Sequence, residues 1–405
     1  MRKLIFYSSL LLLLQSAGMH LSAQNQASFE LGSGLKFSLN EGAYQFKMGG
    51  MIQPYLGLAR TNSQQLDKSL NVKRTYFNIS GTAIKEKVRF FLQTDFSQGT
   101  PLMDAWLAFE PIKDLSITIG QKQSIANNRE MLLMEDKLQF ADRSLLSTSF
   151  CLTGREIGLF VEKKINFLNI GIVPQIAVTS GDGRNSFGID SRDVDLGGLK
   201  YSGRMDLYPL GYFTKGNEDL VADLFHEKTL KMVIGGAASY NTGASHSVGE
   251  GHGDFQLYDV NGLVKLPDYR KIYGDILLKY QGFSFLGEAV ISSATTLDGS
   301  YTTSSNASPL IPTQISEYLA LGTAYNAQIG YVSKNGYALD LRYDALMPEF
   351  ATNPSSLISK TTGLTVGFSK YFKQNDLKMQ ATVSSFTYSD NSNELLGSLI
   401  LQVVF

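Results

Sequence analysis

Apolar and polar residues alternate along most of this chain with the period of a β-strand. In residues 87–97, Val88, Phe90 and Leu92 fall on one face, while Arg89, Gln93 and Asp95 fall on the other. The same alternation recurs at 339–344, at 377–384 and at 395–405, where the chain ends on Phe405. Burying the charged face against a soluble core would cost several kcal/mol, whereas facing a water-filled lumen costs little. The pattern favours a sheet with lipid on one side and water on the other.

The strands predicted from this pattern number about sixteen, as expected for a barrel that encloses an aqueous channel. They are 43–60, 72–82, 87–97, 102–110, 115–123, 155–164, 167–179, 198–208, 229–240, 269–280, 283–294, 317–333, 337–346, 358–372, 377–388 and 395–405. Residues 255–266 also resemble a strand, but an even number with both termini in the periplasm assigns them to an external loop. The expected fold is an all-β transmembrane antiparallel β-barrel.

The connections between these strands alternate in length. Short turns are expected at 83–87, 110–115, 163–166, 281–282, 334–336 and 372–376, with longer polar loops between them, the longest at 124–154. Outer-membrane barrels have short periplasmic turns and long external loops. Within the longest loop, Leu132, Leu133, Asp136, Phe140 and Arg143 repeat with helical spacing. Two readings are open: the loop folds into the lumen, or a short helix covers the rim.

The first residues predict a secretory signal peptide at 1–23, with Arg2 and Lys3 before the apolar run Leu4–Leu14. A transmembrane anchor is the alternative, but the run is too short to cross a bilayer. Residues 24–405 are then the barrel domain. Cleavage would remove two of the 36 Lys and Arg and none of the 37 Asp and Glu, taking the formal net charge from −1 to about −3.

Composition narrows the possible functions. Cys151 is the single cysteine, so the sequence allows no intrachain disulfide and no lipid anchor near the cleavage point. The nearly neutral charge gives no sign of nucleic-acid binding. No nucleophile elbow, zinc-protease motif or phosphate loop occurs, which predicts that the chain is not an enzyme and needs no cofactor.

Residues 73–165 resemble the phosphate-selective porin O/P family of anion-type outer-membrane channels. The resemblance rests on six short stretches in order, listed here: Lys73-Arg74, Asp95-Phe96-Ser97, Asp104-Ala105-Trp106, Gly120-Gln121, Asp142-Arg143-Ser144 and Gly154-Arg155-Glu156-Ile157-Gly158. It implies a homotrimeric channel in the cell outer membrane with cations lining a narrow anion path. It also implies that the strand ending at Phe405 is read by the outer-membrane barrel assembly machinery. Lys73 stands where the family has Arg, which loses bidentate contact with an oxyanion.

The candidate anion-binding and pore-lining residues lie within the resembling region. They are Arg74, Arg89, Arg129, Arg143 and Arg155, with Lys73 and Lys122. Guanidinium forks suit phosphate and carboxylate. The alternative is a lumen wall of mixed charge, because Lys47, Lys200, Arg204, Lys231 and Lys279 alternate with Asp95, Asp104, Asp206, Asp275 and Glu288. Arg143 and Arg155 could instead pair with Glu135, Asp136 or Glu156 to hold the loop.

Two loops carry groupings that resemble metal ligands. Residues 245–254 bring together His246, Glu250, His252 and Asp254, and residues 180–195 offer carboxylate and Asn oxygens for calcium. The glycines of the first and the spacing of the second favour ordinary solvated loops.

The sequence thus predicts an outer-membrane porin that passes small hydrophilic solutes by diffusion, with phosphate or other anions among them. Its partners are membrane lipid, those solutes, the assembly machinery and two further copies of the chain. The alternatives are a non-conducting barrel that serves as a structural subunit of an outer-membrane assembly, and an outer-membrane hydrolase.

Overall fold

The computed structural model describes residues 26–39, 42–62, 64–84, 86–184, 197–250, 253–305 and 308–405. The predicted signal peptide and its cleavage point therefore lie outside the described residues. In this part of the chain, almost all of the regular secondary structure is β-strand.

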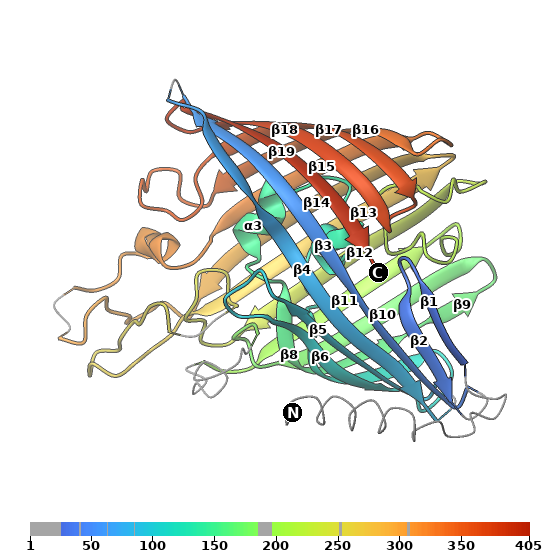
Figure 1. Cartoon of the computed structure of the whole chain (residues 1–405). Coiled ribbons are helices and arrows are strands. Elements are labelled where there is room, and N and C mark those ends of the chain that lie inside the picture. Colours follow the sequence, from blue (N-terminus) through green and yellow to red (C-terminus); the bar gives the residue numbers. More distant parts are fainter. Residues whose placement is uncertain are drawn as a thin grey trace, which may run out of the picture.

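Sixteen of the strands form the wall of one closed antiparallel barrel (Figure 1). In chain order the wall consists of β3 (Tyr44–Thr61), β4 (Asp67–Ala83), β5 (Val88–Asp95), β6 (Leu102–Phe109), β7 (Leu115–Gln123), β8 (Arg155–Lys163), β10 (Ile170–Thr179), β11 (Lys200–Tyr208), β12 (Lys231–Asn241), β13 (Asp268–Tyr280), β14 (Phe283–Thr295), β15 (Gly322–Val332), β16 (Tyr337–Pro348), β17 (Thr361–Lys373), β18 (Leu377–Tyr388) and β19 (Asn393–Val404). The short β9 (Ile165–Phe167) continues β8, since both pair with β10. Pairing of β19 with β3 closes the ring, so the wall has no open edge. The predicted fold and strand number are confirmed.

A hairpin stands before the barrel. Strands β1 (Gln26–Glu30) and β2 (Gly34–Leu39) pair with each other, and β2 pairs with the first residues of β3 beside the end of β19. The amide of Gly32 donates to the carbonyl of Val404 at 2.9 Å, which ties the hairpin to the last strand. The sequence pattern left this segment unassigned.

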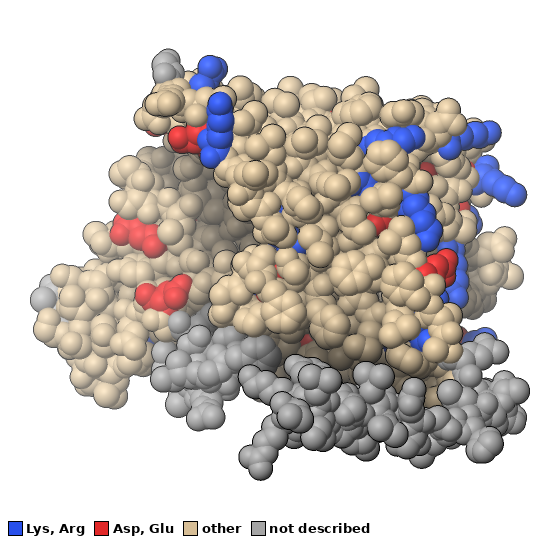
Figure 2. All heavy atoms as spheres, viewed as in Figure 1, with Lys and Arg blue, Asp and Glu red and all other residues tan. Residues whose placement is uncertain are grey.

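The outer face of the barrel is apolar, as the alternation predicted. Leu341, Val383 and Leu399 are exposed on it, whereas Arg342, Ser384 and Gln402 are buried on the lumen side. Figure 2 shows a broad uncharged band across this face, with Lys and Arg gathered toward the end that carries β1 and β2. An apolar band of this kind matches the hydrocarbon of a membrane, as expected for a membrane-spanning barrel.

The two ends of the barrel differ in their connections. Both termini of the wall and the turns at 84–87, 110–114, 281–282, 333–336 and 374–376 lie at one end, which is therefore periplasmic. The long loops, including residues 242–267 with the strand-like segment 255–266 and residues 296–321 with the 3₁₀ turn η3 (Pro312–Glu317), lie at the other. Residues 209–230, which join β11 to β12, depart from the predicted pattern: this periplasmic connection is long.

The longest loop folds into the barrel. Residues 124–154, here called the inward loop, carry α2 (Arg129–Leu132), η1 (Glu135–Lys137) and α3 (Leu145–Phe150), and Figure 1 shows α3 within the ring of strands. The predicted helical repeat from Leu132 to Arg143 does not form one helix, because that stretch contains only the single turn η1. Its apolar residues instead follow the lumen wall, and Phe140 is 2% exposed. Among the described residues, no helix is long and apolar enough to cross a membrane.

Candidate functional site: the lumen constriction

Apolar packing fixes the inward loop against one half of the wall. Leu146 and Phe150 of α3 are fully buried against Tyr273, Val290 and neighbouring lumen-facing residues of β12 to β16. Burial of two such side chains contributes about 3–6 kcal/mol. Serine and threonine in the same short helix leave its other face polar, so the loop presents an apolar side to the wall and a polar side to the lumen.

A group of four charged side chains anchors the start of the loop. Arg129 donates to Asp206 at 2.7 Å and to Asp275 at 2.6 Å, and Arg204 donates to the same two carboxylates at 2.9 and 2.6 Å. All four side chains are at most 9% exposed. Buried charges of this kind are tolerated when each is paired and hydrogen-bonded. Two arginines and two aspartates compensate each other and lock the loop to β11 and β13.

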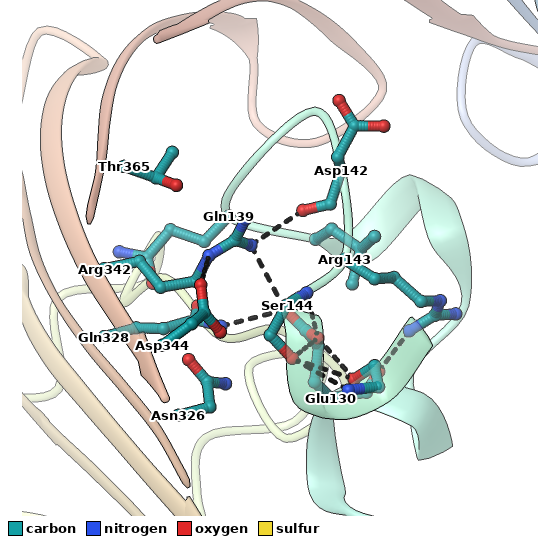
Figure 3. A network of polar contacts seen from close by, with 12 residues as sticks. Glu130, Gln139, Asp142, Arg143, Ser144, Asn326, Gln328, Arg342, Asp344 and Thr365 are labelled. Atoms are coloured by element: carbon teal, nitrogen blue, oxygen red, sulfur yellow. Dashed lines mark hydrogen bonds and ion pairs between the residues drawn. The ribbon is translucent and has the colours of Figure 1, made fainter. Parts of the chain in front are cut away.

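Glu130 forms a second anchor, at the centre of the network in Figure 3. Its Oε2 accepts hydrogen bonds from the backbone and hydroxyl of Ser144 and from the hydroxyl of Ser147, at 2.6 to 2.9 Å. Its Oε1 accepts from the amide of Gln328 on β15 at 2.8 Å and lies 3.8 Å from the guanidinium of Arg342 on β16. One buried carboxylate thus joins both ends of the inward loop to the wall.

Glu135 meets the opposite half of the wall. Its carboxylate accepts from the hydroxyl of Tyr76 at 2.8 Å and from Arg143 at 2.9 Å, and it lies 3.7 Å from Arg155. Burial alone would raise the pKa of Glu135, but the guanidiniums of Arg143, Arg155 and Arg74 outweigh it and hold the pKa well below its usual range. Glu135 is therefore a stable anion at the point where the loop crosses the lumen.

Solvent is excluded where the loop reaches this wall. The lumen-facing residues Tyr76, Gln93, Asp104, Gln121 and Arg155 are each at most 5% exposed, which is far less than a wide water-filled channel would leave. Arg155 donates to Asp104 at 3.0 Å within this layer. The layer of buried polar side chains between β4–β8 and the inward loop is the constriction of the barrel.

A cavity of about 320 Å³ opens on the external side of the constriction. Its lining includes four arginines, Arg74, Arg143, Arg155 and Arg184, and the acidic residues Asp95, Glu135 and Asp142. Arg74 donates to the amide oxygen of Gln53 at 2.8 Å, and Arg184 donates to the hydroxyl of Thr100 at 2.7 Å. Among the described residues, these two guanidiniums have neutral hydrogen-bond partners, and neither forms an ion pair.

A second cavity of about 160 Å³ lies on the periplasmic side. Arg89, Lys122 and Glu162 line it. Arg89 is paired with Glu110 at 2.7 Å, and the ammonium of Lys122 lies 5.2 Å from the centre of the Phe160 ring. The two cavities place charged groups on both sides of the constriction.

The predicted site residues therefore fall into three places. Arg74, Arg143 and Arg155 line the external cavity, and Lys73 pairs with Asp142 beside it. Arg89 and Lys122 line the periplasmic cavity, while Arg129 lies in the anchor with Asp206 and Asp275. The alternative pairing of Arg143 and Arg155 with Glu135 is present.

The sequence interpretation did not single out Arg184 or Glu130. Arg184 belongs to the loop considered for calcium, and nothing in the sequence around this single basic residue indicates that it lines the lumen. Residues 185–196 of that loop lie outside the described residues. Glu130 follows Arg129 directly, and a carboxylate at the start of a helical turn gives no hint of a partner on β15 or β16.

The residues considered for a metal site do not converge. His246 lies 3.3 Å from Asp254, but Glu250 points elsewhere and accepts from the backbone amides of Leu152, Thr153 and Gly154 at 2.9 to 3.0 Å. His252 lies outside the described residues. In the described part of the chain, no group of three or more His, Cys, Asp or Glu side chains is placed to hold a metal ion.

Comparisons with known proteins agree with the fold. No family model matches the chain, and no curated protein matches it. Among solved structures it is similar to the outer membrane channel DcaP of Acinetobacter baumannii, with 11% identity, a TM-score of 0.54 and coverage of 90% of this chain and 99% of that one. It is also similar to the trimer form of OmpT, an outer membrane protein of Vibrio cholerae, with 9% identity, a TM-score of 0.52 and coverage of 89% and 99%. OprB of Pseudomonas putida follows, with 9% identity, a TM-score of 0.51 and coverage of 89% and 94%.

These identities are too low to assign a function, and the resemblance to the phosphate-selective O/P porins stays a prediction. The shared architecture extends over nearly the whole of each chain, since coverage is 89% or more on both sides. The chain has the fold of the outer-membrane barrel porins.

Proposed function

We propose that this protein is an outer-membrane channel that lets small hydrophilic solutes diffuse through a constriction formed by the inward loop. The observation that carries the proposal is the pair of charged cavities on either side of that constriction. A purely structural barrel has no need of lumen cations that lack an ion-pair partner, because removing a charge from water costs free energy. The proposed role involves no chemical reaction and no cofactor.

The charge of the external cavity supports a preference for anions. Its lining holds four arginines against three acidic side chains, and Lys73 stands beside it. Arg74 and Arg184 offer guanidinium forks to phosphate or carboxylate groups without first breaking an ion pair in the described structure. In this scheme Arg143 and Arg155 contact the solute less directly, because Glu135 already holds them. Arg89 and Lys122 receive the anion on the periplasmic side.

Strand lengths and exposed apolar residues in one part of the wall favour assembly as a homotrimer. Strands β5 to β8 have only 8 or 9 residues, against 11 to 18 in β3, β4 and β12 to β19. A membrane-spanning strand needs about 9–11 residues, so β5 and β6, with 8 residues each, are short for lipid and suit contact with other copies. Leu107 on β6 and Ile119 on the adjacent β7 are exposed and would be buried between copies. Mass measurement of the detergent-solubilised protein tests the trimer.

The proposal includes two signals in the sequence. Residues 1–23 are a cleaved signal peptide, and Phe405 is part of the signal that the barrel assembly machinery binds. The backbone of Phe405 exchanges hydrogen bonds with Gly50 at 2.6 and 2.9 Å, so the last residue also helps to close the ring. The N-terminal sequence of the mature protein would locate the cleavage point.

The alternative of a non-conducting structural subunit gains support from the burial of the constriction. Water is excluded from the contact of Glu135 with Tyr76, and a fixed loop would leave no open path there. The two functions differ in one measurable property, namely whether the isolated barrel passes ions.

Planar-bilayer recording of the refolded protein tests the proposal. Discrete conductance steps, a reversal potential of anion sign in a salt gradient, and a current reduced by added phosphate would support an anion channel. Steps without selectivity would leave a general porin. The absence of conductance steps from a folded, heat-modifiable barrel would favour the structural subunit.

A further inference from the structure

The periplasmic connection 209–230 has no topological reason to be long. It joins β11 to β12, which are neighbours in the sheet and pair from Lys200 with Asn241 to Leu207 with Ile234. A hairpin turn of about two to five residues is enough to connect such strands. The extra residues therefore require a different explanation, and their position in the lumen supplies one.

The segment is folded up into the periplasmic mouth of the barrel. Phe213 and Val221 pack with Val233, Leu277 and Leu286, which face the lumen from β12, β13 and β14. On the opposite side, Ala222 and Leu224 pack with Val332, Ala338 and Tyr371 of β15, β16 and β17. The segment thus spans the mouth from β12 to β17.

Specific polar contacts hold the segment in place. The ammonium of Lys279 on β13 donates to the backbone carbonyls of Asn217 and Leu220. Asp223 accepts from the amide of Gly282 at 2.8 Å, and Gln281 donates to the carbonyl of Glu227 at 2.9 Å. The segment is thus tied to β13 and to the 281–282 turn, and Lys279, Asp223 and Glu227 are themselves buried.

Within the segment, two carboxylates organise the backbone. Asp223 accepts from the side chain of Asn217 at 2.8 Å and from the amide of Glu227 at 3.0 Å. Glu227 accepts in turn from the backbone and hydroxyl of Thr214, at 2.7 and 2.9 Å. Such internal bonding describes a folded plug that keeps its shape.

The segment also meets the inward loop. Leu133 of that loop belongs to the same apolar cluster as Phe213 and Val221. The external loop and the periplasmic segment therefore meet inside the barrel and fill the side of the lumen bounded by β11 to β19. The two charged cavities lie on the other side, along β4 to β10.

We propose that residues 209–230 form a periplasmic plug that confines solutes to the β4–β10 side of the lumen and sets the size and charge of the channel exit. The plug exposes four charged side chains, the carboxylates Glu218 and Asp219 and the ammonium groups of Lys215 and Lys228. Over residues 211–230, four carboxylates (Glu218, Asp219, Asp223 and Glu227) outnumber two lysines, so the plug lessens the preference for anions as well as the conductance. The part of this inference that concerns conductance rests on the proposed channel function.

The first test replaces residues 211–230 by an Asn-Gly turn, which joins the same two strands. The shortened protein should give conductance steps at least two-fold larger than the full chain, with a reversal potential shifted toward anions. Asp223→Ala, which removes the tie to Gly282 without shortening the chain, should raise conductance in the same direction. Glu218→Gln should shift only the reversal potential, and Asp114→Asn at the same rim is its matched control. Unchanged conductance in a folded shortened barrel would overturn the proposal.

A second test needs no conduction. Ala338 is 2% exposed beneath the plug, whereas Lys334 is exposed in the neighbouring turn. A water-soluble maleimide should label Ala338→Cys at least ten-fold more slowly than Lys334→Cys in the full chain, and at a similar rate once the plug is shortened. Equal rates in the full chain would mean that the mouth is open and the plug absent. If neither protein conducts but the labelling contrast holds, the plug stands and the channel function fails.

Discussion

The guanidinium of Arg129 donates through Nε to Oδ1 of Asp275 at 2.6 Å, which joins the inward loop to strand β13 across 146 positions of the sequence. Arg204 and Asp206 complete this buried group. Since each charge is satisfied only while the loop is docked, the position of the loop and the stability of the barrel are coupled.

Replacing Arg129 by Met should therefore destabilise the protein. Two aspartates would then share Arg204 alone, and breaking a buried ion pair costs about 3–5 kcal/mol. Reversible unfolding in urea with lipid vesicles measures the loss. The double variant Arg129→Met/Asp275→Leu should lose less than the sum of the two single variants, because neither charge is left without its partner. Strict additivity would show that the pair does not hold the loop.

Glu250 should control the mobility of the end of the inward loop. Its carboxylate accepts from three consecutive backbone amides, those of Leu152, Thr153 and Gly154. Hydrogen bonds to a charged acceptor contribute about 1.5–3 kcal/mol, so Glu250→Ala should speed amide exchange at these residues by about ten-fold or more. Hydrogen exchange followed by mass spectrometry measures it. Exchange at β18 in the same protein is the internal control, and equal acceleration there would indicate global loosening instead.

The lipid face gives a test of the barrel orientation. Leu341 is 44% exposed on the outside of β16, and Arg342, the next residue, is 2% exposed on the lumen side. Leu341→Arg should cost about 2–4 kcal/mol near the membrane midplane and lower the fraction of heat-modifiable barrel on gels. Arg89→Leu, a lumen change, should leave assembly nearly intact. The reverse ranking of the two variants would contradict the assignment of the faces.

Selectivity should depend on the arginines that have neutral partners. Arg74→Gln and Arg184→Gln each remove a cation that the described structure leaves without a carboxylate partner, so each should move the reversal potential away from anions. Phosphate block should weaken by roughly ten-fold for each, the size expected for one lost charge-assisted hydrogen bond of about 1.4 kcal/mol.

Arg60→Gln is the matched control for these variants, since Arg60 lies exposed on the outer side of β3 near the external rim. A control that shifts the reversal potential as much as Arg74→Gln would mean that the external cavity has no special role.

The sequence by itself determined the wall of this protein. Alternation puts Leu341 outside and Arg342 inside for a local reason, because successive side chains of a strand point to opposite faces. Strand number and direction followed from the same period and from the even count that closure demands. Candidate cations such as Arg74 and Arg155 could be named because alternation already placed them on the polar face.

Only the tertiary structure decided what fills the lumen. The helical spacing from Leu132 to Arg143 does not correspond to one helix, since tertiary contacts with the wall decide its conformation. Glu130 meets Arg342, and Leu133 meets Val221, through residues far apart in the chain. Residues 209–230 gave no signal of an inward fold either, because their contacts with Lys279 and Gly282 exist only once β11 to β17 have curved into a closed wall. Local periodicity specifies a wall, whereas long-range contacts inside the closed barrel specify the path through it.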